Sequence, residues 1–444
     1  MNFSRRFFCS ENLVAEIFPK IITLLPVILL IWFTSRYFVE IPFWDEFLIP
    51  RLMMEIESGK MTLLSACWRL HNEHRLFFPT LIMLELAKLA AWNIRAECWL
   101  IFLLAIGCFY IICRFLIEGL AKGYTWLAIM ASSFLIFSLN QWENWLWGFQ
   151  IEILLMEFCF LLALYAVTRP DLKIRHMAAA SVFSLISSFS FGTGLLSWPL
   201  VALTLLLHRP RRIYAAIAFI SMFIAVLALY FYGYKKPESH PSILAFTSNP
   251  GEFIAYIFMF LGYPIADSHA LMLGGIALTW FIAGNIIVFK KNLTSPNTQI
   301  AMLVMGLFAI SSAILIAFGR IGFGAEQALS SRYITIANLL WLSDIGYLYL
   351  GLQLLGKKYV LLKEIITALC LVAMIPGYMR GWHEGKLHHR LLKAAKVAVL
   401  SEFPAFKDET LLKILPVPSK ARERLLYMEE KKLSLFHKAP GADQ

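Results

Sequence analysis

Two adjacent carboxylates, Asp45 and Glu46, stand a few residues beyond the first long apolar run, directly after Phe43 and Trp44. A carboxylate at a membrane surface can accept the proton of an attacking hydroxyl that lies within hydrogen-bond reach. A neighbouring tryptophan lowers the local dielectric, so we expect Trp44 to raise the pKa of this carboxylate. Acids also decorate hydrated loop starts, which leaves a structural interpretation open. Asp45 and Glu46 are the candidate catalytic residues.

A second polar group follows at the end of the same loop, in the segment His71-Asn72-Glu73-His74-Arg75. Arg75 can bind a phosphate, and His74 a phosphate or a sugar hydroxyl. The candidate substrate-binding residues here are His71, Glu73, His74 and Arg75. His71 and His74 could share one face of a helix. A divalent ion would suit these ligand types, but the spacing fixes no third ligand, so we predict no metal and no cofactor. A polar cap on a helix starting at Phe77 is the structural alternative.

A third group, between residues 141 and 150, alternates tryptophan with amide and carboxylate side chains. Aromatic faces pack on the C–H face of a sugar, while Asn, Gln and Glu bond its hydroxyls. A belt of tryptophans at the membrane interface is the structural alternative. Glycines in the nearby segment 191–194 permit a tight turn and close approach of a ligand. The candidate substrate-binding residues here are Trp142, Glu143, Asn144, Trp145 and Gln150.

Arginines mark a later polar loop, in which Arg320 and Arg332 lie on either side of a glycine-rich stretch and Tyr333 follows. The guanidinium fork suits a phosphodiester oxygen, so these three residues are candidates for binding a lipid phosphate. Arginines at span ends also snorkel to lipid headgroups, which is the alternative. Asp344, near the middle of its apolar run, is the one deep acid expected, and acids inside a membrane are functional candidates.

The composition indicates that these candidate residues belong to a membrane protein. Of 444 residues, 59% are hydrophobic and 16% charged, against about 45–50% and 25% in soluble domains. Soluble, disordered and fibrous proteins are therefore excluded, and the chain is predicted to be an all-α polytopic protein whose partner is the lipid bilayer. The net charge of +11 fits Lys and Arg in cytoplasmic loops, and no nucleic-acid-binding signature is present. Seven cysteines without paired spacing indicate neither a disulfide framework nor a zinc site.

Hydropathy and the basic loops predict eleven spans with the N-terminus inside. Arg5, Arg6 and Lys20 precede the first span, and basic residues also mark the loops at 168–176, 208–212, 290–291 and 357–358. The predicted spans are Ile21–Val39, Glu97–Ile117, Trp126–Asn140, Ile151–Val167, Met177–Phe191, Leu195–Leu207, Ile213–Tyr232, Ala270–Phe289, Gln299–Phe318, Tyr333–Leu355 and Val360–Met379.

The order of inside and outside loops leaves no crossing for the apolar run Phe77–Trp92, which carries Glu85 and Lys88. We interpret it as a helix in the outer interface. A second short apolar helix, Glu252–Ile265, is also expected outside. Residues 1–379 then form a transmembrane domain with residues 40–96 as its first external loop. Residues 380–444 form a polar tail, which we place outside despite its surplus of Lys and Arg, since charge bias weakens away from span ends.

This order of elements resembles the GT-C superfamily of integral-membrane glycosyltransferases: one span, an external loop opening with Asp45 and Glu46, interfacial helices, then many spans. The resemblance implies that Asp45, in the first external loop, is the general base and that Arg332 binds the phosphate of the donor. It further implies inverting transfer of a sugar from a polyprenyl-phosphate monosaccharide to a glycan or lipid acceptor. Within this superfamily, the chain resembles bacterial enzymes that decorate lipopolysaccharide O-antigen from undecaprenyl-phosphate sugars.

The expected location is therefore the bacterial inner membrane, with the active site on the periplasmic side. Two alternatives remain: a transporter or flippase of a lipid-linked sugar, which would use acids and broken helices at mid-membrane, and an O-antigen polymerase. The external cluster of acids, histidines and tryptophans favours the enzyme.

Overall fold

A computed structural model describes residues 19–208, 212–236, 241–242, 244–355 and 360–437. The basic residues Arg5, Arg6, Arg209, Arg211 and the pair at 357–358, which anchored the predicted topology, lie outside the described residues.

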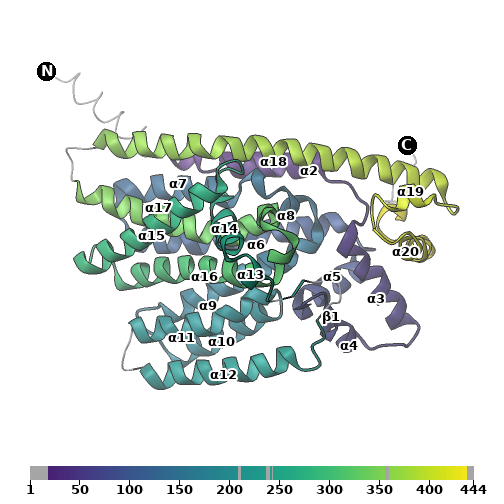
Figure 1. The fold of residues 1–444 in the computed structure, drawn as a ribbon, viewed down its shortest axis with the longest axis horizontal. Helices are drawn as coiled ribbons and strands as arrows, with labels where there is room; N and C mark the ends of the chain where they lie inside the picture. The colour runs from purple at the N-terminus through teal and green to yellow at the C-terminus, as the bar shows by residue number, and fades with distance from the viewer. Residues whose placement is uncertain (1–18, 209–211, 237–240, 243, 356–359, 438–444) are drawn as a thin grey trace.

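Each predicted span has a helical counterpart, because in lipid the backbone must satisfy its own hydrogen bonds. These helices are α2 (Leu25–Tyr37), α6 (Ile94–Gly119), α7 (Lys122–Ile136), α9 (Ile151–Val167), α10 (Ile174–Ser188), α11 (Ser197–His208), α12 (Ile213–Phe231), α15 (Ala270–Lys291), α16 (Pro296–Arg320), α17 (Ile334–Leu354) and α18 (Val360–Glu402). They lie side by side along the long axis of the molecule (Figure 1).

Within the described residues, eight helices are long and apolar enough to cross a membrane, rather than the eleven predicted. The helices α10 and α11 have 15 and 12 residues, which is short of the ~20 residues that a span needs. The helix α17 is long enough, but Asn338, Ser343 and Asp344 make it less apolar. These polar residues are buried against protein, so α17 does not have to match lipid.

The helix α18 does not end at residue 379. The whole helix has 43 residues, from Val360 to Glu402, a length of about 64 Å at 1.5 Å per residue. A bilayer core of ~30 Å accommodates about half of it. The remainder carries the C-terminal segment to the far end of the bundle, where Figure 1 places α19 (Asp408–Leu411) and α20 (Pro418–Glu430) beside α3 (Leu48–Glu57).

The short loops after α6, α9 and α15 meet at one end of the bundle. Arg169 lies 3.6 Å from Glu118, in the last turn of α6, and Arg212 donates to the carbonyl of Leu172. Thr294 donates to the carbonyl of Gly119, and so joins the loop after α15 to the same end.

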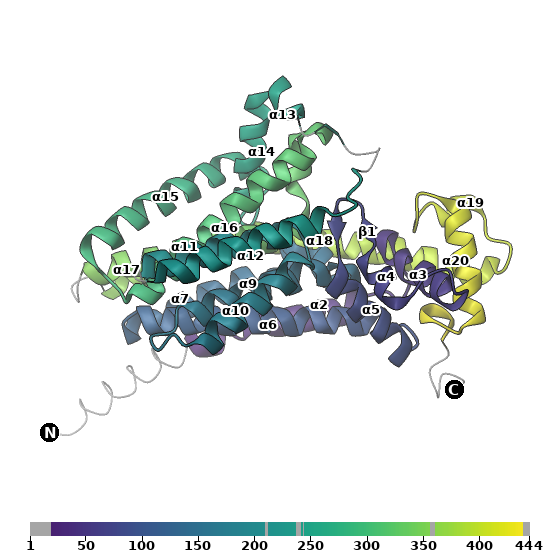
Figure 2. The ribbon, with the colours of Figure 1, turned by 90° about the horizontal axis from the view of Figure 1, so that it is seen from below.

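The other end holds the first loop. It contains the 3-10 helix η1 (Trp44–Phe47), α3, α4 (Leu63–Trp68), the two-stranded hairpin β1 (Leu70–His71) and β2 (His74–Arg75), and α5 (Phe77–Leu89). With 13 residues, α5 is only about 20 Å long. It packs beside α3 and α4 (Figure 2) and is not among the candidate spans.

The C-terminal segment docks onto this first loop. The backbone N–H of Trp44 donates to the carbonyl of Ile414 at 2.8 Å, and the N–H of Ser434 donates to Ala91 at 2.9 Å. Lys431 pairs with Glu57 of α3 at 2.8 Å. The tail and the first loop therefore share one end of the bundle.

Candidate functional site

Asp45 and His71 form the centre of the candidate site. His71 Nε2 lies 3.1 Å from Asp45 Oδ1, and the side chains are 17% and 32% exposed. Burial raises the pKa of Asp45, but the hydrogen bond and charge of His71, with Arg332 and Arg320, outweigh burial and lower it. The expectation that Trp44 raises this pKa is therefore wrong. The carboxylate is ionised at neutral pH, as a proton acceptor must be.

Glu46, the second candidate base, lies in a different environment although it is the next residue. Its side chain is buried, and its two oxygens accept the backbone N–H groups of Phe43, at 2.8 Å, and Gly148, at 2.9 Å. Burial and the neighbouring carboxylate of Glu97 raise its pKa well above the usual range. Glu46 therefore joins the first loop to the 141–150 segment and is not exposed to a substrate.

The short hairpin, rather than a helix, places the two histidines. His71 pairs with His74 across the strands, and Asn72 forms the turn with φ of 52°. The segment does not cap α5 either, because the N-cap of α5 is Leu76 and makes no side-chain bond. The ring of His74 packs on Phe191 with centroids 4.5 Å apart.

Gly192 follows Phe191 and approaches the hairpin closely. A Cβ at this position would lie 2.8 Å from His74 Nδ1. The glycine-rich 191–194 turn therefore borders the histidines, as a close-approach site should.

Two arginines extend the site beyond Asp45. Arg320, at the end of α16, forms an ion pair with Glu73. Arg332 lies in the 3-10 helix η8 (Ser331–Tyr333), 5.9 Å from the ring of Trp147. Both arginines act electrostatically on Asp45. Together they put positive charge beside an ionised carboxylate.

The charge on Arg332 is secured by its surroundings. Burial lowers the pKa of its guanidinium, but Tyr333 and the carboxylates of Glu143, Glu152 and Asp45 outweigh burial and raise it. Arg332 is thus a permanent cation.

Arg75 has a structural role instead. Its guanidinium is buried and donates to the carbonyls of Trp68, at 2.7 Å, Tyr230, at 2.6 Å, and Tyr232. These bonds fix the hairpin to the end of α12 and occupy the donors that a phosphate would need. Tyr333 is also buried, and its hydroxyl accepts a bond from Gln327.

The 141–150 segment holds Arg332 rather than presenting a sugar-binding surface. Glu143 accepts the N–H of Arg332 at 3.1 Å, and Asn144 donates to the carbonyl of Arg332, also at 3.1 Å. Trp145 is 2% exposed and donates to Ser138. Trp142 packs against His388 with centroids 5.1 Å apart. Gln150 is buried as well.

Glu152, in the first turn of α9, is a site residue that sequence reasoning missed. It is buried and interacts electrostatically with Asp45, Glu73, Arg320 and Arg332. The sequence signal that could have found it is an acid in the first turn of an apolar span, two residues after Gln150.

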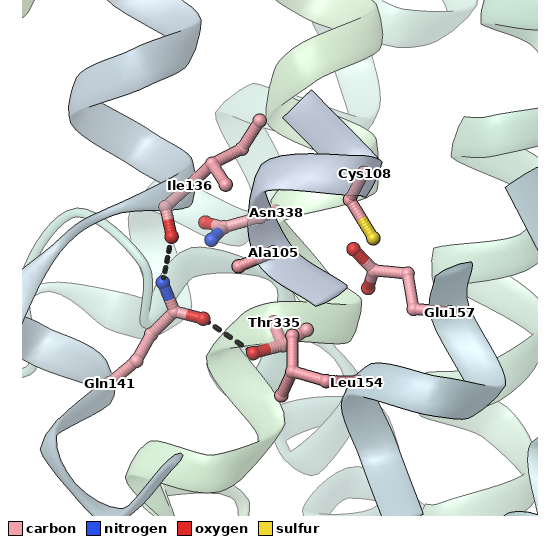
Figure 3. Close-up of a pocket in the computed structure, with 8 residues that line it drawn as sticks. All are labelled: Ala105, Cys108, Ile136, Gln141, Leu154, Glu157, Thr335 and Asn338. Carbon is pink, nitrogen blue, oxygen red and sulfur yellow. Dashed lines mark hydrogen bonds between the residues drawn. The ribbon is translucent and has the colours of Figure 1, made fainter. Parts of the chain in front are cut away.

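A separate small cavity, lined by both apolar and polar side chains, lies inside the bundle (Figure 3). Glu157 and Asn338 point into it from different helices, and neither Glu157 Oε2 nor Asn338 Oδ1 has a hydrogen-bond partner in the described part of the chain. Asp344 is therefore not the one deep acid, although it too is buried. The cavity is lined by Ala105, Cys108, Ile136, Gln141, Leu154, Glu157, Thr335 and Asn338.

Within the described ranges, no three His, Cys, Asp or Glu side chains gather as a metal site. Asp45 and His71 offer one oxygen and one nitrogen ligand. No family model, no curated protein and no solved structure matches the chain. The function of the site therefore follows from the chemistry of its own residues.

Proposed function

We propose that the protein transfers a sugar from a polyprenyl-phosphate monosaccharide to a glycan or lipid acceptor at the outer face of a membrane. The observation that carries this proposal is the ionised Asp45, held by His71 beside Arg320 and Arg332. A base next to two cations suits a reaction that removes a proton and releases a phosphate. The resemblance to GT-C glycosyltransferases points the same way.

In the proposed reaction, Asp45 accepts the proton of the acceptor hydroxyl while that oxygen forms a bond to C1 of the donor sugar. The bond between C1 and the phosphate oxygen breaks, and its electron pair leaves with the polyprenyl phosphate. Arg332 and Arg320 stabilise the negative charge that develops on the phosphate. Attack from the face opposite the phosphate inverts the anomeric centre. His71 orients Asp45 and supports its ionised form.

The proposal is tested with purified protein, a radiolabelled polyprenyl-phosphate sugar and a lipopolysaccharide acceptor. Wild type should produce glycosylated acceptor and free polyprenyl phosphate in equal amounts, and Asp45→Asn should not. Asp171→Asn is the matched control, because this exposed carboxylate lies in the loop after α9 at the basic end. Equal activity of the two variants would contradict the assignment.

We also propose that the protein is a multi-pass protein of a bacterial inner membrane, with a cytoplasmic N-terminus and a periplasmic site. The short loops that hold Arg169 and Arg212, and the loop that follows Lys290 at the end of α15, meet at one end of the bundle, away from α3 and β1 (Figure 2), which supports this orientation.

A transporter of a lipid-linked sugar is the second candidate, and the cavity at Glu157 and Asn338 favours it. Ionisable groups inside a membrane are typical of proton and ion pathways. A transporter would lose movement of lipid-linked sugar across vesicles on Glu157→Gln and keep it on Asp45→Asn. A transferase would give the opposite pattern in the transfer assay.

A further inference from the structure

Trp44, the residue before Asp45, exposes its ring where neighbouring tryptophans do not. Its side chain is 48% exposed, whereas Trp145 and Trp147 are 2% and 4% exposed. The indoles of Trp145 and Trp147 donate to the carbonyls of Ser138 and Phe43. Trp44 therefore offers a ring face to a ligand beside the candidate base.

The backbone of Trp44 is also strained. Its φ of 46° lies in the left-handed region, which suits glycine and is rare for a bulky side chain. Trp92 has a similar φ of 50°, but its ring is fully buried and its indole donates to Glu97. Packing of the buried ring therefore explains the positive φ of Trp92. The ring of Trp44 contacts Phe43 alone among the described aromatic rings, with centroids 5.6 Å apart.

The backbone of Trp44 is held by the docked tail, because its N–H donates to the carbonyl of Ile414 at 2.8 Å. Trp44 lies seven residues after α2 ends at Tyr37, in the short helix η1 that also carries Asp45. The arginines that act electrostatically on Asp45, where the donor phosphate is proposed to bind, come from other segments, at the end of α16 and in η8.

Building on the proposed function, we propose that Trp44 is a carbohydrate-binding platform for the acceptor. Trp44 directly precedes Asp45, and the Cα atoms of consecutive residues are about 3.8 Å apart, so an acceptor of two or more sugars is long enough to contact both the Trp44 ring and Asp45. The occupant is an acceptor of at least two sugars, whose apolar C–H face packs on the indole. Strain at this position is retained because it holds the ring beside the base.

Two substitutions separate the ring from the backbone. Trp44→Gly removes the ring and leaves a residue suited to the positive φ, so the loop should keep its geometry. Trp44→Phe keeps an aromatic face. We expect Trp44→Gly to raise the acceptor KM about tenfold, with the donor KM and the melting temperature unchanged, and Trp44→Phe to stay close to wild type. An unchanged acceptor KM in Trp44→Gly would overturn the platform.

A binding measurement keeps this inference distinct from the proposed function. Protein labelled with 5-fluorotryptophan has a ¹⁹F resonance from Trp44, assigned by its loss in Trp44→Phe. Maltose, cellobiose and lactose at millimolar concentration serve as probes. A shift of this resonance without any sugar transfer by wild type supports the platform and rejects the transferase. Transfer with no shift and no change of acceptor KM in Trp44→Gly rejects the platform and keeps the transferase.

Discussion

Replacing Asp45 with Asn tests the central assignment, because it removes the basic oxygen and little else. Asn keeps an Oδ1 that can accept the bond from His71 Nε2, now at 3.1 Å, so the loop geometry should persist. General-base catalysis contributes about 10²–10⁴-fold in rate, which equals roughly 3–5 kcal/mol of transition-state stabilisation. We expect kcat to fall by this factor with the donor KM nearly unchanged.

The fold should tolerate this substitution. The Asp45 carboxylate is one-third exposed, and exposed ion pairs are typically worth only ~0–1 kcal/mol. Because its pKa is lowered in the folded protein, ionised Asp45 contributes stability above the unfolded pKa of about 3.9. That contribution is lost as the pH falls through the folded pKa. The melting temperature of Asp45→Asn should therefore be lowest relative to wild type near neutral pH. The difference between the two melting temperatures should shrink as the solution becomes acidic.

The assay is single-turnover transfer of labelled sugar by protein in nanodiscs, with melting temperature and membrane yield measured in parallel. A rate within tenfold of wild type, from protein of normal yield, would refute the role of Asp45. A large loss of yield would refute the claim that this carboxylate contributes little to folding.

Three further predictions follow from the contacts of the site. Burial raises the folded pKa of Glu46, so wild type should lose melting temperature as the pH rises from about 4.5, and Glu46→Gln should flatten that slope. Arg332→Gln should raise the donor KM about 10–100-fold, because a charge-assisted bond to the phosphate is lost. Arg75→Gln should instead lower the yield and the melting temperature. If the two variants change the donor KM and the melting temperature equally, the distinction between a phosphate-binding Arg332 and a structural Arg75 is contradicted. Cysteines at Asn72 and Lys290, both exposed, should label from opposite sides with an impermeant maleimide in right-side-out vesicles.

The helices could be predicted from the sequence because each apolar run must form its own backbone hydrogen bonds in lipid. The basic loops between spans could be predicted to lie on one side of the membrane, because the bias towards Lys and Arg applies to residues close to the span ends. What the sequence could not give was the length of α18, because polar residues after Met379 continue a helix as readily as they end one. Eight described helices, rather than the eleven predicted, are long and apolar enough to cross a membrane, and α17 falls short in apolar character because Asn338 and Asp344 on it face protein.

The site was predicted in part. Asp45, His71, Arg320 and Arg332 were named from residue type, and the structure brings them together. The sequence could not show which of the other candidates, such as Glu46 and Arg75, are buried and which are open to a substrate, because burial depends on segments far apart in the chain. Gly148 donates to the buried Glu46 and packs so closely that a Cβ there would lie 2.3 Å from Glu97 Oε2, and no local sequence pattern reports this packing.

The buried segment at 141–150 has a role that follows from its bonds. Asn144 donates both to Thr335, at 2.7 Å, and to the carbonyl of Arg332, and Thr335 donates to Gln141. Gln141 and Thr335 also line the interior cavity (Figure 3). The position of the arginine beside Asp45 is therefore set by a polar network that reaches into the bundle, and a change at Asn144 should move Arg332 without touching a substrate.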